Sequence, residues 1–320
     1  MSNNIGATTR IQYTPSTKFY LEDLKNGIQW VTNLPFPVQV VEKTEIIDHL
    51  NRTKLVTVYK YHHGYYNGRE REFRGFGRVD QYDTENFDIF VNSSLHNGKA
   101  LFNNKQKGFH VPPVLVKTWF HTGVYYDENN PFADSQFYDQ TDMMRSYRKE
   151  FFNGDEYAFK LDDNSVESGE TPHEAYRILR GAIIRKEVYG LDNSVKQNNP
   201  YIVSENQYRV SLLQDKKSNI NGVYIRNLCE SLTYHYERNP NDPRIIHQIN
   251  LGFDNYGNIT DTISIAYPRR PFYASYNEQK MVKVTYTWSK FINEDIFDAD
   301  LENFYHIGIP CETKTFEILG

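Results

Sequence analysis

The stretch Tyr59 to Asp83, YKYHHGYYNGREREFRGFGRVDQYD, has the residue pattern of a long two-stranded β-ribbon. β-Branched and aromatic residues, which favour strands, recur on both sides of the pair Asn67-Gly68. Asn and Gly tolerate the positive φ angles of a type I′ turn, so this pair predicts a two-residue hairpin turn. A chain organised around such a ribbon favours folds with antiparallel strands.

Three glycines lie inside the two arms of the predicted hairpin, at Gly64, Gly75 and Gly77. Glycine in a strand interior weakens the strand, so we interpret these positions as β-bulges or as places where another backbone comes close. Together with Asn67 and Gly68 they are the residues that we single out as structural determinants of the hairpin.

The rest of the N-terminal region predicts further strands. Residues 8–21 alternate well enough for one strand with a break at Pro15, and Val38 to Ile47 predicts another. Pro35 and Pro37 indicate a loop over Trp30 to Phe36, because proline cannot donate to a strand ladder. Val114 to Tyr126 again has the pattern of a strand.

Two short helices are predicted in the middle of the chain. In Asp139 to Phe152 the apolar side chains recur at helical spacing. The second helix has clearer signals: Thr171 can be the N-cap, Pro172 suits the first helical position, and Glu174 can complete a capping box. Gly181 can end this helix in the left-handed conformation.

From Ala182 onward the pattern predicts strand after strand, with turn signals such as Asn221-Gly222 between them. The predicted strands are Ile183–Leu191, Tyr201–Leu213, Tyr224–Glu237, Arg244–Phe253, Ile259–Tyr267, Met281–Lys290 and Thr313–Ile318. Strands at short spacing without intervening helices indicate a mainly β fold of long antiparallel strands and hairpins. We expect residues 1–135 to be rich in β-hairpins, 136–181 to be a helical or loop insertion, and 182–320 to be an antiparallel β segment. The three parts should form one continuous structural unit.

Composition supports wide sheets with one wet face. The chain has 25 Tyr and 20 Phe, and Tyr buries a ring while keeping a hydroxyl for a polar partner. The net charge of −5 comes without a basic tract, so nothing suggests binding to nucleic acid or direct contact with a membrane. The two cysteines, Cys229 and Cys311, give no disulfide framework, and each is expected to be a free, buried thiol. The N-terminus lacks the apolar core of a signal peptide.

Histidines give a weak signal for a metal site. His62 and His63 are adjacent on a predicted strand, where neighbouring side chains point to opposite faces, and His110 and His121 lie in a nearby stretch. Zinc sites need three or four convergent ligands, usually at a recognisable spacing. Since that spacing is absent from the sequence, we expect structural histidines and no metal or cofactor.

A run of charges on the returning arm of the hairpin has two interpretations. Its members are Glu70, Arg71, Glu72, Arg74 and Arg78. They could line a charged substrate groove, or they could form weak ion pairs on a solvated strand, each worth under about 1 kcal/mol. We expect the solvated strand.

The sequence contains no catalytic motif, and we predict no catalytic residue. Carboxylates are abundant and aromatic rings could stack on sugars, so a carbohydrate-binding or glycosidase-like β module remains an alternative. In that case Trp30, Trp119 and Trp288 should line a cleft near paired acids. The run Asn239 to Pro243 is expected to be a rigid turn.

Several stretches resemble the B component of the Tc (toxin complex) insecticidal toxins. Besides the EREFRGFGRV run of the hairpin, they are Gly6–Asp23, Leu34–Lys43, Val111–Gly123, Leu179–Asp192 and Leu232–Ile245. The resemblance covers nearly the whole chain and corresponds to the region between the propeller-bearing middle part and the RHS repeats. The turn Phe253 to Asn258 is similar to the tip of one RHS repeat.

The resemblance implies a non-catalytic, structural section of a B component. In that family, long β-strands wind into a hollow shell that encapsulates a toxic cargo, held unfolded until translocation. The implied partners are flanking B-component segments and a C-component RHS protein with its toxic cargo. The implied location is secreted or extracellular, as part of the toxin complex.

Overall fold

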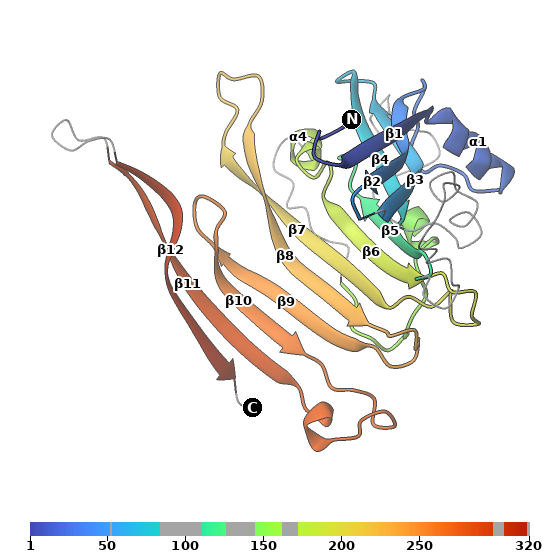
Figure 1. Ribbon diagram of the computed structural model, residues 1–320. Helices are drawn as coiled ribbons and strands as arrows, with labels where there is room; N and C mark the ends of the chain where they lie inside the picture. The colour runs from blue at the N-terminus through green and yellow to red at the C-terminus, as the bar shows by residue number, and fades with distance from the viewer. Residues whose placement is uncertain (52, 84–110, 126–144, 162–171, 297–303, 319–320) are drawn as a thin grey trace. The chain divides into compact units, whose positions relative to one another are not determined.

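The computed structural model describes residues 1–51, 53–83, 111–125, 145–161, 172–296 and 304–318. Their strands are β1 (Ala7–Pro15), β2 (Gln39–Asp48), β3 (Thr53–Asn67), β4 (Glu72–Tyr82), β5 (Val114–Phe120), β6 (Ile183–Gly190), β7 (Ile202–Gln214), β8 (Val223–His235), β9 (Arg244–Phe253), β10 (Ile259–Ala266), β11 (Lys283–Ile296) and β12 (Phe304–Ile318). The order of the strands in the sheet is their order in the chain, from β1 to β12 (Figure 1). Each pair with a described register is antiparallel. The predicted mainly β fold is therefore confirmed.

Helices are few in the described part of the chain: α1 (Thr17–Lys25), α4 (Pro172–Arg177), a 3-10 turn η3 (Asn277–Lys280), and one helical turn at residues 145–148. The helix predicted after Thr171 is α4, and Gly181 lies beyond it with φ +76°. The helix predicted from Asp139 to Phe152 is helical at 145–148, and its residues 139–144 lie outside the described residues.

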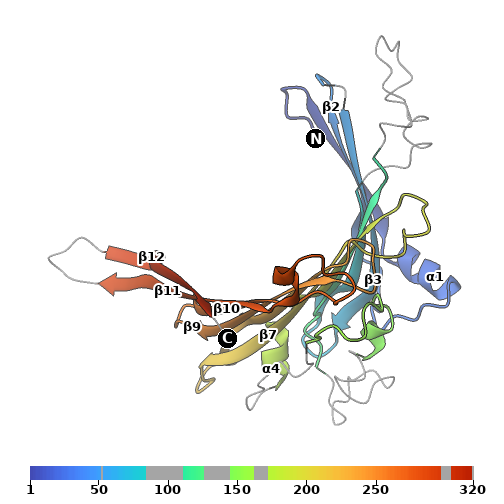
Figure 2. The same cartoon turned by 90° about the horizontal axis from the view of Figure 1, so that it is seen from below.

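Helix α1 corrects the strand predicted over residues 8–21. The strand β1 ends at Pro15, and the helix begins at Thr17. The spacing of Phe19 and Asp23 places both on one helical face, and both are buried there. Because α1 packs on β3, distant contacts outweigh the local alternation that favoured a strand (Figure 2).

The turn of the central hairpin also differs from the prediction. Asn67 ends β3 and pairs with Glu72 at the start of β4, so the connection has four residues, Gly68 to Arg71. The positive φ angle, +54°, is at Arg71. The type I′ turn at Asn67-Gly68 is wrong because the Asn67 Oδ1 accepts the Glu70 N–H at 2.9 Å and bridges a longer loop.

The last two strands extend further than predicted, each beyond an irregular position that interrupts the apolar pattern. The register shifts between Ile292 and Glu294. Opposite this shift Gly308 has φ +71°, and its N–H donates to Asn293 Oδ1 at 2.8 Å. The side chain of Asn293 thus replaces a ladder contact and lets the hairpin continue past the bulge.

The chain forms two compact units made of non-contiguous segments. Unit 1 comprises Met1–Thr122, Tyr126–Phe152 and Lys186–Ile202. Unit 2 comprises Gly123–Tyr125, Asn153–Arg185 and Val203–Gly320. A hydrophobic cluster of unit 1 contains Phe19, Trp30 and Val40, and one of unit 2 contains Ala175, Leu179 and Val210.

In unit 2 the two faces of strands β9 to β12 differ in polarity. Residues opposite each other on antiparallel strands share a face. One row across these strands reads Ile249, Ile263, Tyr286, Phe316. The next row, which faces the other way, reads Gln248, Ser264, Thr285, Glu317. The faces therefore differ in polarity at these two rows, whereas the row Asp261, Trp288, Lys314, on the same face as the first row, is mixed.

Candidate functional site

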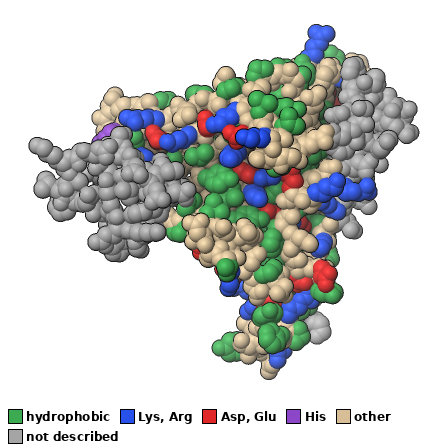
Figure 3. Space-filling model, turned by 90° about the vertical axis from the view of Figure 1, so that its right-hand side faces the viewer, with side chains coloured by type: hydrophobic (Ala, Val, Ile, Leu, Met, Phe, Trp, Pro, Cys, Tyr) green, Lys and Arg blue, Asp and Glu red, His purple; other side chains and the backbone are tan. Residues whose placement is uncertain are grey.

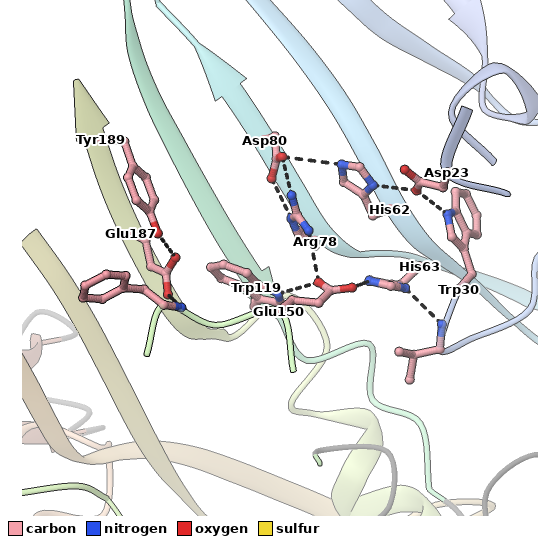
Figure 4. Close-up of polar contacts among 12 residues, drawn as sticks. Asp23, Trp30, His62, His63, Arg78, Asp80, Trp119, Glu150, Glu187 and Tyr189 are labelled. Atoms are coloured by element: carbon pink, nitrogen blue, oxygen red, sulfur yellow. Dashed lines mark hydrogen bonds and ion pairs between the residues drawn. The ribbon is translucent and has the colours of Figure 1, made fainter. Parts of the chain in front are cut away.

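Charged side chains meet inside unit 1, although charged residues are rarely buried unless they are paired. Four of them, Asp23, His62, Arg78 and Asp80, have exposed fractions of 4%, 5%, 9% and 4%. With Glu150 they form what we call the buried cluster (Figure 4). Its members come from α1, β3, β4 and the segment just after residues 145–148, so the cluster ties these elements together.

Arg78 lies at the centre of the buried cluster. Its Nε and Nη2 donate to the two carboxylate oxygens of Asp80 at 2.7 and 2.5 Å, and its Nη1 donates to Glu150 at 3.2 Å. The guanidinium carbon lies 5.4 Å from the centre of the Trp119 ring, a cation–π distance. Burial alone would raise the pKa of Asp80, but hydrogen bonds from His62 and Arg78 outweigh it, and the pKa lies well below its usual value.

His62 lies between two carboxylates. Its Nδ1 is 2.6 Å from Asp23 Oδ2, and its Nε2 is 3.6 Å from Asp80 Oδ2. The same oxygen of Asp23 accepts the indole N–H of Trp30 at 2.7 Å. Burial would lower the pKa of His62, but the hydrogen bond with Asp23 and the nearby carboxylate of Asp80 raise it above its ordinary value.

His63 has different partners, and its backbone is in the left-handed region with φ +57°. Its Nδ1 accepts the backbone N–H of Val31 at 3.0 Å, and its Nε2 lies 2.8 Å from Glu150 Oε1. The positive φ interrupts the alternation of β3, so the expectation that the two histidines point to opposite faces is wrong. Both rings are buried, with centroids 6.3 Å apart.

The carboxylates of Glu150 and Glu187 complete the polar interior of unit 1. Glu150 also accepts the indole N–H of Trp119 at 3.1 Å. Burial would raise the pKa of Glu150, but the hydrogen bond from His63 and the charge of Arg78 lower it to about 2. Glu187 has no exposed surface and accepts the Phe152 N–H at 2.8 Å and the hydroxyl of Tyr189 at 2.6 Å.

The charge run of β4 is only partly solvated. Arg74 has an exposed fraction of 4% and pairs with Glu70 at 2.6 Å and with Glu72 at 3.4 Å. Arg71 is exposed, whereas Arg78 belongs to the buried cluster. The solvated-strand prediction is therefore wrong for Arg74 and Arg78, because both side chains are buried against carboxylates, Arg74 at the bulge beside Gly75 and Arg78 within the regular part of β4.

Of the three glycines singled out in the hairpin, Gly64 and Gly77 lie directly against other side chains, and Gly75 lies at a β-bulge. A Cβ on Gly64 would lie 2.8 Å from Leu34, and one on Gly77 would lie 2.1 Å from the Tyr147 hydroxyl. Gly75 has φ +96° and lies at the register shift of β3 and β4.

The described residues hold no group of three His, Cys, Asp or Glu side chains that could bind a metal ion. His110 lies outside these residues. Neither cysteine forms a disulfide bond; Cys229 is buried as expected, whereas the expectation of a buried thiol is wrong for Cys311, which is exposed on β12. The members of the buried cluster are largely buried, with the side chain of Glu150 16% exposed, and their opposite charges compensate one another and hold the elements together.

The tryptophans do not form the arrangement expected of a sugar-binding cleft. Trp30 and Trp119 have exposed fractions of 7% and 0%. Trp288 is half-buried, with the Lys314 ammonium 5.5 Å from its ring centre. In the run Asn239 to Pro243, Asp242 is buried and pairs with Arg269, so its side chain anchors the turn.

The surface has mixed charge where Figure 3 displays it. Lys and Arg side chains (blue) and Asp and Glu side chains (red) are interspersed with hydrophobic ones (green) on that face. Among the helices that the structure describes, none has the length and apolar character that crossing a membrane requires.

Comparisons with known proteins give consistent matches. The family described as "Insecticide toxin TcdB middle/N-terminal region" matches residues 1–123, and "Insecticide toxin TcdB middle/C-terminal region" matches residues 174–301. A search of curated proteins found no match.

Three similar solved structures are a TcdB2-TccC3 crystal structure, the same pair without the hypervariable C-terminal region, and the Tc holotoxin pore of Photorhabdus luminescens. Each is 28% identical over 99% of this chain, with TM-scores of 0.73, 0.74 and 0.74. This chain spans only 15%, 15% and 14% of the lengths of those chains.

Proposed function

Because the chain belongs to the family of insecticide toxin TcdB middle regions, we propose that it is a non-catalytic wall section of a β-shell that encapsulates a toxic polypeptide. The wall would be continued by flanking B-component segments and closed by a C-component RHS protein. The assembled toxin complex would be secreted, and the cargo would stay enclosed until translocation.

One observation carries this proposal. Nearly the whole chain, 99%, aligns with a section of TcdB2 structures that were solved together with TccC3. The strand order supports it, because strands that follow one another in chain order build a continuous surface. The opposed polar and apolar rows of β9 to β12 give that surface two chemically distinct sides.

The polar interior of unit 1 supports a structural role. Asp80 and Arg78 bind each other and lie out of reach of solvent. A buried, compensated cluster offers no surface to a substrate, whereas removing one of its members would leave an uncompensated charge.

The proposal is testable with two neighbouring positions on β12 that face opposite ways. Phe316 lies opposite Tyr286, Thr315 lies opposite Thr287, and both side chains are exposed. A photo-crosslinking amino acid is placed at one or the other position in a full-length B component that carries this section. Each variant is assembled with a C component that has, or lacks, its C-terminal toxic region.

A shell wall exposes one side to the cargo. We expect one of the two positions to give a crosslinked product that requires the toxic region, and the other to give none. Cargo-dependent products at both positions, or at neither, would refute the enclosing role. Light irradiation of the B component alone measures the background.

A further inference from the structure

The protonation of His63 follows from its hydrogen bonds. A backbone N–H can only donate, so the Nδ1 that accepts the Val31 N–H at 3.0 Å carries no proton. The proton of the ring is therefore on Nε2, which donates to Glu150 Oε1 at 2.8 Å. The His63 ring is neutral in this arrangement.

The neighbouring ring has the opposite state. Both nitrogens of His62 face carboxylate oxygens, Asp23 at 2.6 Å and Asp80 at 3.6 Å, and ionised carboxylates only accept hydrogen bonds. Nδ1 is within hydrogen-bond distance of Asp23, whereas Nε2 is within ion-pair distance of Asp80 and makes no hydrogen bond, so two carboxylates favour the doubly protonated, charged ring. Adjacent histidines of one strand are thus held in different charge states by partners from different elements.

The closed arrangement has no place for a second proton on His63. A proton on Nδ1 would point at the Val31 N–H, so two donors would face each other. Among the facing groups, the ionised carboxylate of Glu150 favours a charged ring, but it contacts Nε2, shares its charge with Arg78 of β4 and accepts the indole N–H of Trp119 of β5, so it leaves the two donors at Nδ1 facing each other. The other close neighbours are the rings of Tyr147, at 5.3 Å, and Trp30, at 6.5 Å, and the charged His62 at 6.3 Å.

We propose that His63 is an acid-sensitive latch that holds the loop Trp30–Phe36 on β3. Protonation of Nδ1 displaces the Val31 N–H and opens the loop locally. The state that binds more protons is favoured as the pH falls, so acidification shifts the equilibrium toward the open loop. Besides Val31, the loop is held by the hydroxyl of Thr32, which lies 2.8 Å from the His63 carbonyl and 3.1 Å from that of Gly64, and by the Asn33 carbonyl, which accepts the Tyr66 N–H at 3.0 Å. Opening of the loop therefore removes contacts to both the imidazole ring and the backbone carbonyl of His63.

The first test reads the rings directly in the intact 320-residue chain. Correlation spectra of 15N-labelled histidine distinguish the two neutral tautomers from the imidazolium. At about pH 6.5, where an ordinary histidine is half charged, we expect neutral, Nε2-protonated His63 and cationic His62. A proton on Nδ1 of His63 while the loop is closed would overturn the proposal.

The second test measures opening. Amide exchange of residues 30–34, divided by the intrinsic rate at each pH, should rise as the pH falls from about 7.5 to 5, by at most tenfold per pH unit for one coupled proton. His63→Asn keeps an acceptor for Val31, tolerates the positive φ and does not titrate, so its corrected exchange should be flat.

His49→Asn is the matched control, because His49 is an exposed histidine of the same unit that contacts Thr8. It should behave like the wild type. A pH-independent wild-type loop would refute the latch, as would His63→Asn retaining the wild-type pH dependence.

Discussion

Replacing Arg78 by Met tests the energetic role of the buried cluster. Methionine keeps an unbranched side chain over Trp119 but removes the charge that Asp80 and Glu150 share. Both carboxylates have depressed pKa values, so both stay ionised near neutral pH and lose a buried cation.

The magnitude follows from which contacts remain. Breaking a buried ion pair by removing one partner costs about 3–5 kcal/mol. Asp80 keeps His62, and Glu150 keeps His63 and Trp119, so neither carboxylate loses all its donors. We therefore expect the free energy of unfolding of unit 1 to fall by about 4 kcal/mol, within that range.

Urea unfolding followed by tryptophan fluorescence measures this change. In a Trp288→Phe background the remaining tryptophans, Trp30 and Trp119, both belong to unit 1. With a denaturant slope of about 2 kcal/mol per molar, the midpoint should fall by about 2 M.

Lys60→Met is the matched control, because Lys60 and Glu22 form an ion pair of the same unit whose side chains are 45% and 43% exposed. Its midpoint should change by less than about 0.5 M, since such pairs contribute about 0–1 kcal/mol. Adding Asp80→Asn and Glu150→Gln to Arg78→Met removes the uncompensated charges and should recover part of the loss. A loss below about 1 kcal/mol for Arg78→Met alone would show that the cluster does not carry compensated charge.

Three further predictions concern pH and packing. The pKa of Glu150 is lowered from an ordinary 4.5 to about 2, so ionised Glu150 stabilises the fold above pH 4.5, and this stabilisation is lost as the pH falls toward 2. Glu150→Gln should therefore make the urea midpoint depend less on pH between about 4.5 and 2. His62 has the opposite effect on stability, because its pKa is raised. Its contribution to the free energy of unfolding is complete below pH 6.5 and is lost as the pH rises through the raised pKa. The urea midpoint of His62→Gln should therefore fall less than that of the wild type as the pH rises. Gly77→Ala should lower the thermal stability by about 1–3 kcal/mol because its Cβ meets the Tyr147 hydroxyl, and Tyr147→Phe should relieve part of this loss.

Local patterns predicted most strands correctly. The β9 strand was predicted with the bounds that the structure gives, Arg244 to Phe253, and the resemblance to Tc toxin B components agrees with the matching families. Strands and turns of this kind are encoded by alternation and by turn residues a few positions apart.

The buried cluster was not predictable in the same way. His62 contacts Asp23 across 39 positions of the chain, and His63 contacts Glu150 across 87. In the sequence, Arg78 looks like an arginine on a solvated strand, and only the structure shows that it is buried and paired with Asp80 and Glu150. The left-handed His63 is held by the loop at Val31, and nothing in the neighbouring residues of β3 signals it. The spacing of Phe19 and Asp23 was the one local sign of α1, and the alternation of the preceding residues concealed it.

The chain-ordered sheet has a consequence for biosynthesis. Each strand from β2 onward pairs with the strand made just before it. During translation, no completed pair has to separate to admit a later strand, and each addition closes only the loop between consecutive strands. The free edge of the sheet is therefore always the most recently synthesised strand, so the sheet can fold cotranslationally, strand by strand from β1 to β12.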